Sequence, residues 1–409
     1  MKPGDIAKSA VALAISMAAV LQLSVSQASA AGPTKGLNRK EFGILCTAVV
    51  SSENIKDLPQ AGKNTKEAAA VAAHISLILS DYLAIQKLAT TPPKQQSKQP
   101  PDTDIPEKCR GSAWAECIAA AAYLKSLPSA GQTALKKAAT DSTQLRLNLN
   151  ITLAKLLAAK AKLLDERSIA AKKLKIATAL KKAVYGGEGT DQQPKLLGEG
   201  SERQAHCGTK TTGGTSAKLS IGVTIACLCA SGSNSDDSNT ACYRSATTNQ
   251  ADWNQNTAIT AWDAITTNCE NDAPQKTTAT AQELRHLTNK LKALLYEPKG
   301  NDGTIGYIGN PDGSASAGNC DGDHTGGKGG CATFTSTANT ITLPPWLTEL
   351  ENGARAAEEY ESAAQATAAA EATIEALNET LATTLYLTTL SAAVAEGTVK
   401  SPEKNGGHK

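Results

Sequence analysis

The residues with the most directly interpretable chemistry are the cysteines. A cysteine either oxidises to a disulfide or, as a thiolate, binds a metal such as zinc, and the cellular compartment decides between the two. Ten cysteines, an even number, indicate up to five disulfides if the chain is exported. They are Cys46, Cys109, Cys117, Cys207, Cys227, Cys229, Cys242, Cys269, Cys320 and Cys331.

One disulfide is predicted from sequence spacing. Cys320 and Cys331 flank a glycine-rich stretch that closes a loop easily, so we expect them to bond to each other. Cross-linking a loop of this size contributes roughly 3 kcal/mol to stability.

The pair Cys227 and Cys229 is too closely spaced to bond internally, so each needs a partner elsewhere. We expect the partners to be among Cys207, Cys242 and Cys269. A zinc site using this pair with His206–Cys207 is the alternative. It is disfavoured because Cys-x-Cys is tighter than the usual zinc-site spacing and because an oxidising compartment removes thiolates.

Two further motifs imitate ligand-binding loops. Gly322–Lys328 has the Gly-x4-Gly-Lys core of a phosphate-binding loop, but Gly329 replaces the required Ser/Thr and no apolar strand precedes it. Asp321 and Asp323 resemble the opening of a calcium loop, yet the acid required at the twelfth position is Ala332. Both motifs are better explained as a structural loop closed by cysteines.

No catalytic constellation is present in the sequence. None of the five histidines lies in a His-Glu-x-x-His motif, and no Gly-x-Ser-x-Gly motif occurs. The formal net charge of +2 gives no indication of a nucleic-acid partner. We therefore predict a non-enzyme without catalytic residues, cofactor or metal site.

The N-terminus has the pattern of a secretory signal peptide. Lys2 and Lys8 precede the apolar segment Ala10–Val25, and Ala28–Ala30 fits the small-x-small rule for cleavage. The apolar segment is short for a membrane span of about 20 residues. We expect residues 1–30 to be removed and the mature chain to follow the secretory pathway.

The rest of the chain is predicted to be mostly α-helical. Apolar residues at steps of three and four indicate one long helix over Thr133–Tyr185 and a second that begins at Pro344–Trp346. These would form an antiparallel coiled-coil rod. Between them, about residues 188–342 form an irregular, disulfide-stapled head, with one helix at Thr277–Tyr296 and short strands near Lys218–Cys229 and Thr304–Ile308.

The predicted domains follow from this pattern. Residues 31–396 form one elongated helical domain, and residues 397–409 form a polar, linker-like tail. Two Asn-x-Thr sequons, at Asn150 and Asn378, are candidate N-glycosylation sites on the predicted helices. Asn150 lies in an apolar run, whereas we expect Asn378 to lie on a polar face.

The order of these features resembles the N-terminal domain of trypanosome variant surface glycoproteins, most closely class B. The resemblance covers nearly the whole mature chain. It rests on Glu41-Phe42…Leu45-Cys46, on Cys227-Leu228-Cys229 followed by Cys242, and on Asn319-Cys320-Asp321-Gly322…Gly330-Cys331 shortly before the second long helix.

This resemblance implies a coat protein that shields the cell sterically and varies antigenically, with host antibodies as its partners. It implies a homodimer, or a trimer as in some class B members, held to the outer membrane by a C-terminal glycolipid. It also implies an O-linked sugar in the loop containing Ser314 and Ser316. No hydrophobic attachment signal follows Val399, so we expect no anchor on this sequence as it stands.

Two other classes are considered. Trypanosome receptors for serum proteins such as transferrin have similar helical rods, but an apolar or basic head would be expected, and this head is polar. A secreted enzyme is disfavoured by the absence of catalytic motifs.

Overall fold

The computed structural model describes residues 36–55, 62–91, 107–140, 144–232, 241–242, 250–272, 278–312, 318–322, 329–337 and 340–395. The chain divides into two compact units, Met1–Asp57 with Ala170–Tyr360 and Leu58–Ile169 with Glu361–Lys409. The expected signal peptide and the polar tail lie outside the described residues.

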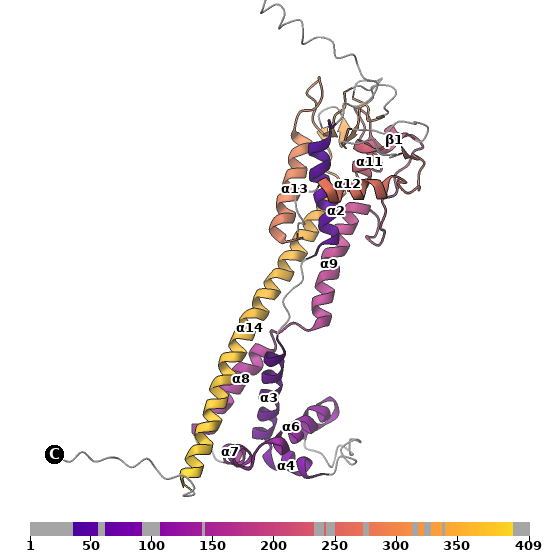
Figure 1. Ribbon diagram of the computed structural model, residues 1–409. Coiled ribbons are helices and arrows are strands. Elements are labelled where there is room, and N and C mark those ends of the chain that lie inside the picture. Colours follow the sequence, from indigo (N-terminus) through magenta and orange to yellow (C-terminus); the bar gives the residue numbers. More distant parts are fainter. Residues whose placement is uncertain are drawn as a thin grey trace, which may run out of the picture. The chain divides into compact units, whose positions relative to one another are not determined.

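The described chain is mostly helical (Figure 1), as predicted. The helices are α2 (Arg39–Glu53), α3 (Lys63–Ser80), α4 (Tyr82–Thr90), α6 (Trp114–Ser126), α7 (Ser129–Thr140), α8 (Gln144–Lys160), α9 (Glu166–Tyr185), α10 (Arg203–Cys207), α11 (Ile221–Cys229), α12 (Trp262–Asp272), α13 (Ala281–Tyr296) and α14 (Pro345–Ala395), with 3-10 turns η3 (Glu107–Cys109) and η4 (Gly111–Ala113).

The strands are short and form two-stranded sheets. They are β1 (Ser231–Gly232), β2 (Gln250–Ala251), β3 (Tyr307–Gly309), β4 (Cys331–Thr333), β5 (Thr335–Thr337) and β6 (Thr340–Ile341). β1 pairs with β2 in parallel, whereas β3–β4 and β5–β6 are antiparallel. The β3–β4 register places Gly309 opposite Cys331, next to the predicted disulfide.

The second unit is held by a helical apolar core. Its α3, α4, α6, α7 and α8 pack with the later part of α14 around a cluster that includes Ile75, Ile78, Leu79, Leu149, Leu153, Leu156 and Ile374. Buried alanines such as Ala72, Ala120 and Ala138 belong to the same cluster and let neighbouring helices approach closely. Among the described helices none alone could cross a membrane by length and composition, although α3 and α4, bent by 110°, meet that test together.

The first unit is built around α2. This helix contacts α11, α12 and α13, while α11 also contacts β3 and β4. Every residue of α11 is buried, and Ser220 begins the helix by accepting a hydrogen bond from the backbone N–H of Val223 at 3.1 Å. A buried helix can be apolar on all sides, so it lacks the amphipathic period of a surface helix.

Two predictions of secondary structure are wrong. The predicted strand near Lys218–Cys229 is helix α11, because a short apolar run without periodicity does not distinguish a strand from a buried helix. The single helix predicted over Thr133–Tyr185 is divided into α7, α8 and α9. Helix α8 ends at Lys160. Asp165 then caps the start of α9, because its side chain accepts a hydrogen bond from the backbone N–H of Ser168 at 2.7 Å.

The second long helix agrees with its prediction. α14 runs unbroken through 51 residues, and its early residues belong to the first unit and its later residues to the second. In the first unit, a Cβ added at Gly353 would lie 2.9 Å from Cδ2 of Leu180, so α9 and α14 approach closely there. The predicted head, about residues 188–342, falls entirely within the first unit.

Candidate functional site

All ten cysteines are buried and form five disulfides. The pairs are Cys46–Cys269, Cys109–Cys117, Cys207–Cys227, Cys229–Cys242 and Cys320–Cys331. The Cys320–Cys331 bond is the one predicted from spacing. Because every cysteine is oxidised, the thiolates needed for the alternative zinc site are not available.

The partners of Cys227 and Cys229 resolve the alternatives left open by the sequence. Cys227 bonds Cys207 and Cys229 bonds Cys242, whereas Cys269 bonds Cys46 in α2. Three disulfides therefore surround α11 and α2. They connect segments between 13 and 223 residues apart in sequence.

A buried arginine donates hydrogen bonds to backbone carbonyls at the C-terminal end of α11. Arg203 is 7% exposed and donates from its two terminal nitrogens to the carbonyl of Cys227 at 2.7 Å and of Ala230 at 2.6 Å. Its guanidinium lies 5.0 Å from the ring centre of Trp253. A positive charge here meets the partial negative charge of a helix C-terminus and its unpaired carbonyls.

Asn38, at the N-terminus of α2, completes this arrangement. Its side-chain amide donates to the carbonyls of Leu228 at 3.3 Å and Gly330 at 2.6 Å, and its side-chain oxygen accepts from the N–H of Asn310 at 3.1 Å. The residue is 1% exposed, so these bonds replace water that cannot reach it. One side chain thereby joins α2 to α11 and to the β3 and β4 segments.

His206, in α10, is a buried polar residue of the first unit. Its Nε2 lies 3.2 Å from the carbonyl of Gly200 and 3.1 Å from that of Trp253, while Nδ1 lies 2.7 Å from the hydroxyl of Ser216. Ser216 also accepts from the N–H of Gly198 at 2.9 Å, so its hydroxyl proton is directed to Nδ1. The network assigns a neutral ring with the proton on Nε2. Burial lowers the pKa of His206. The hydrogen bonds to the two carbonyls act in the opposite direction but are outweighed.

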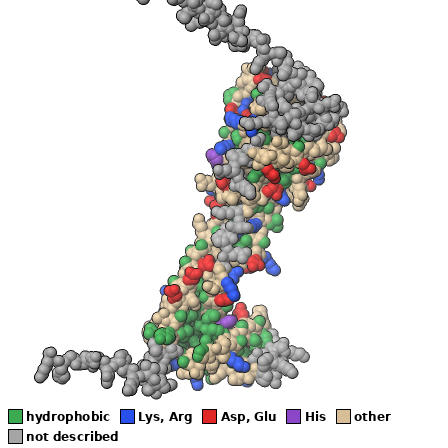
Figure 2. All heavy atoms as spheres, viewed as in Figure 1, with side chains coloured by type: hydrophobic (Ala, Val, Ile, Leu, Met, Phe, Trp, Pro, Cys, Tyr) green, Lys and Arg blue, Asp and Glu red, His purple; other side chains and the backbone are tan. Residues whose placement is uncertain are grey.

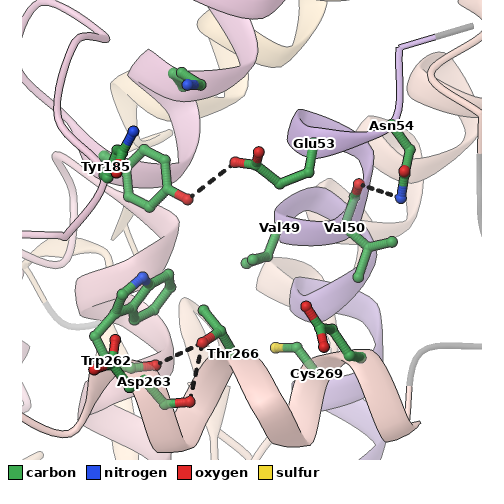
Figure 3. A pocket seen from close by; sticks show the side chains of 12 residues that line it. Val49, Val50, Glu53, Asn54, Tyr185, Trp262, Asp263, Thr266 and Cys269 are labelled. Carbon is green, nitrogen blue, oxygen red and sulfur yellow. Dashed lines mark hydrogen bonds between the residues drawn. The ribbon is translucent and has the colours of Figure 1, made fainter.

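A pocket of about 400 Å³ lies in the first unit among α2, the end of α9 and α12 (Figure 3). Tyr185 points its hydroxyl across the pocket toward Glu53, with a 3.4 Å hydrogen bond to Oε1. Burial, with the Glu53 carboxylate, raises the pKa of Tyr185 to about 12. The lining residues are Val49, Val50, Glu53, Asn54, Lys181, Tyr185, Gln192, Trp262, Asp263, Thr266, Cys269 and Glu270.

The two candidate N-glycosylation sites differ in exposure. Asn150 is exposed on α8, between the exposed side chains of Leu147 and Ile151, whereas Asn378 on α14 is half-buried. The sequence suggested the opposite ranking, since Asn150 lies in an apolar run. In the structure Leu149 and Leu153 of this run are buried in the core, whereas Leu147 and Ile151 next to Asn150 are exposed. Ser314 and Ser316 lie outside the described residues.

The two ligand-loop motifs lie only partly within the described residues, which omit 323–328. Gly322 donates its N–H to the carbonyl of Gly329 at 3.0 Å, which closes the base of the loop next to Cys320–Cys331. Over the described parts of the chain, no group of three or more His, Cys, Asp or Glu side chains is arranged to hold a metal ion.

Sequence reasoning did not identify Arg203 or Asn38, and it considered His206 only as a zinc ligand. Neither Arg203 nor Asn38 lies in a recognisable motif, and the partners of the three residues are 6 to 292 residues away in sequence. Their shared role is to form hydrogen bonds with buried polar atoms of the backbone and of side chains. These features define the class of protein as a helical scaffold cross-linked by buried disulfides.

Comparison with known proteins gives the family. A family model for the trypanosomal VSG (variant surface glycoprotein) domain matches residues 20–376, and the chain belongs to this family. It is similar to Variant surface glycoprotein ILTAT 1.25 of Trypanosoma brucei brucei, with 31% identity over 329 residues. The aligned part covers 79% of this chain and 64% of that relative.

The resemblance found from the sequence is thus confirmed. The family consists of surface coat proteins of the secretory pathway, whose role is structural rather than enzymatic. The chain spans under two thirds of the length of the relative that it matches.

We predict that two of the buried disulfides of the first unit contribute to stability according to loop length. Cys46–Cys269 closes a separation of 223 residues and Cys320–Cys331 one of 11. Chain-entropy arguments give about 5 kcal/mol for the longer loop and about 3 kcal/mol for the shorter one. Double replacement of each pair by alanine, followed by urea unfolding, measures the difference. Equal losses from the two fully buried pairs would contradict a dominant loop-closure effect.

We also predict that acidification destabilises the fold through His206. Its folded-state pKa lies below 6.5. The unfolded chain therefore takes up a proton that the folded chain resists, and stability falls as the pH drops below about 6.5, by up to about 1.4 kcal/mol per pH unit. His206→Gln keeps the hydrogen-bonding capacity without titrating and should make the decline between about pH 6.5 and 5 shallower.

The control for this experiment is His286→Gln, at an exposed position of α13. It should leave the pH dependence of the urea-unfolding free energy unchanged. An unaltered slope in His206→Gln would show that the buried imidazole is not responsible.

Proposed function

We propose that this protein shields the cell surface sterically and varies antigenically, so that host antibodies are its binding partners. The observation that carries the proposal is the VSG-domain match over residues 20–376. Family membership implies a coat protein, whereas immune evasion by this chain is our inference. Shielding requires a stable, bulky scaffold and no reaction chemistry.

The division between interior and surface supports this function. The polar interior of the first unit is fixed by buried disulfides, Arg203, His206 and Asn38. The exposed side chains that the structure describes in the segment 188–342 lie outside this set of interior bonds, so we expect them to change without altering the fold. Figure 2 shows acidic and basic side chains interspersed over the visible face, as the small net charge suggests.

We further propose that the long helices run antiparallel as a coiled coil and that the chain self-associates as a dimer or trimer. The close approach of Gly353 to Leu180 supports helix pairing in the first unit, and the shared core of α8 and α14 supports it in the second. Exposed apolar side chains such as Leu174 and Tyr296 are available for contacts between copies. We expect the full-length protein to be held on the membrane by a C-terminal glycolipid.

The coat function is tested on living cells. An antiserum against the folded chain should label the whole surface of unfixed trypanosomes that express this gene and should not label an isogenic clone that expresses another family member. Light scattering of the purified native protein should give twice or three times the chain mass. Labelling only after permeabilisation, or specific capture of a host serum protein, would argue for a different role.

We propose N-linked glycans at Asn150 and Asn378, with Asn150 the better exposed site. A glycan at Asn150 would cover the neighbouring Leu147 and Ile151, which are 53% and 46% exposed. Peptide N-glycosidase should lower the mass of the native protein, and Asn150→Gln should remove part of that change. Asn148→Gln, on the same helix but outside a sequon, is the matched control. An Asn150→Gln protein with the full mass change would exclude this site.

A further inference from the structure

The pocket among α2, α9 and α12 has aromatic walls. Tyr185 and Trp262 are 5% and 2% exposed, and both line the pocket. Their rings meet edge to face with centres 5.9 Å apart. Figure 3 shows them on the side of the pocket opposite Val49 and Glu53 of α2. Electron-rich aromatic rings attract cations, an interaction that strengthens as water is excluded.

The same pocket has an excess of negative charge. Glu53, Asp263 and Glu270 contribute three carboxylates, against the single ammonium of Lys181. Within the described structure, none of these four side chains takes part in a salt bridge. A concave site lined by one sign of charge concentrates ligands of the opposite sign.

Glu53 retains the capacity to bind a ligand. Its Oε1 accepts hydrogen bonds from Tyr185 at 3.4 Å and from Ser52 at 3.5 Å. Both are longer than the usual range of about 2.5–3.0 Å between oxygens. A cationic donor next to this carboxylate would make a shorter, charge-assisted bond.

We propose that this pocket binds a small organic cation with an ammonium or quaternary ammonium head. The head lies beside the Glu53 carboxylate on the side of the pocket lined by Tyr185 and Trp262, and the exposed carboxylates of Asp263 and Glu270 add to the attraction. The volume of about 400 Å³ lies within the range of small-molecule sites, about 300–1,000 Å³. A coat function does not require such a site, so this binding activity goes beyond the proposed function.

Other ligand classes fit the pocket less well. An anion would face three carboxylates with only Lys181 as a counter-charge. A bare metal ion would need several ligating side chains arranged together, and the described residues contain no such group of three. An aromatic wall also contributes more to an organic cation than to a hydrated metal ion.

The proposal is tested with choline, using the full chain and isothermal titration calorimetry. The matched probe is 3,3-dimethyl-1-butanol, which has the same shape without the charge. We expect saturable binding of choline, with a dissociation constant of roughly 0.1–10 mM, and at least several-fold weaker binding of the neutral probe. Binding should weaken as salt is added, because the attraction is partly electrostatic.

Two variants assign the binding to this pocket. Glu53→Gln keeps the shape of the side chain and should weaken choline binding by roughly 2–5-fold, and adding Asp263→Asn should weaken it further. Glu351→Gln removes the same charge from an exposed position of α14 and should have no effect. Circular dichroism melting shows whether each variant is folded.

Three results would overturn the proposal. They are the absence of saturable choline binding up to about 100 mM, equal binding of the neutral probe, and unchanged affinity in the folded double variant. The first excludes the site, the second excludes charge recognition, and the third places the binding elsewhere.

Discussion

The first unit depends on satisfying the C-terminal carbonyls of a helix that is buried along its whole length. Water cannot reach the end of α11, so each carbonyl there needs a partner from the protein. Arg203 binds those of Cys227 and Ala230, and Asn38 binds that of Leu228. Removing either side chain would take a hydrogen-bond donor from these buried carbonyls, and the loss of one such bond destabilises a protein by about 0.5–1.5 kcal/mol.

This requirement explains why distant segments meet around α11. Arg203 comes from α10, and the next turn of that helix supplies His206 and then Cys207, which bonds Cys227. Asn38 brings the start of α2, and its other bonds hold the β3 and β4 segments. Hydrogen bonds fix the orientation of these elements, while the disulfides restrict the unfolded chain.

The second unit is stabilised differently. Its helices α3 to α8 follow one another in the sequence and, with the later part of α14, bury an Ala/Leu/Ile core, and one short disulfide, Cys109–Cys117, joins η3 to α6. Close packing of apolar helix faces stabilises this unit. The first unit contains a pocket beside Cys46–Cys269, where Tyr185 and Glu53 face each other. A scaffold suited to a coat protein can therefore also carry a ligand site.

The sequence by itself determined the features with local signals: the helical class, the long helix α14, the helix α13 and the Cys320–Cys331 disulfide. Periodicity, a proline at a helix start and a short loop between cysteines act over neighbouring residues. Only the tertiary structure decided that Lys218–Cys229 is helical, because burial on all sides removes the period that would reveal a helix. It also decided the partners of Cys227 and Cys229 and the roles of Arg203 and Asn38. Those contacts join residues far apart in sequence, and their geometry exists only once the helices have packed.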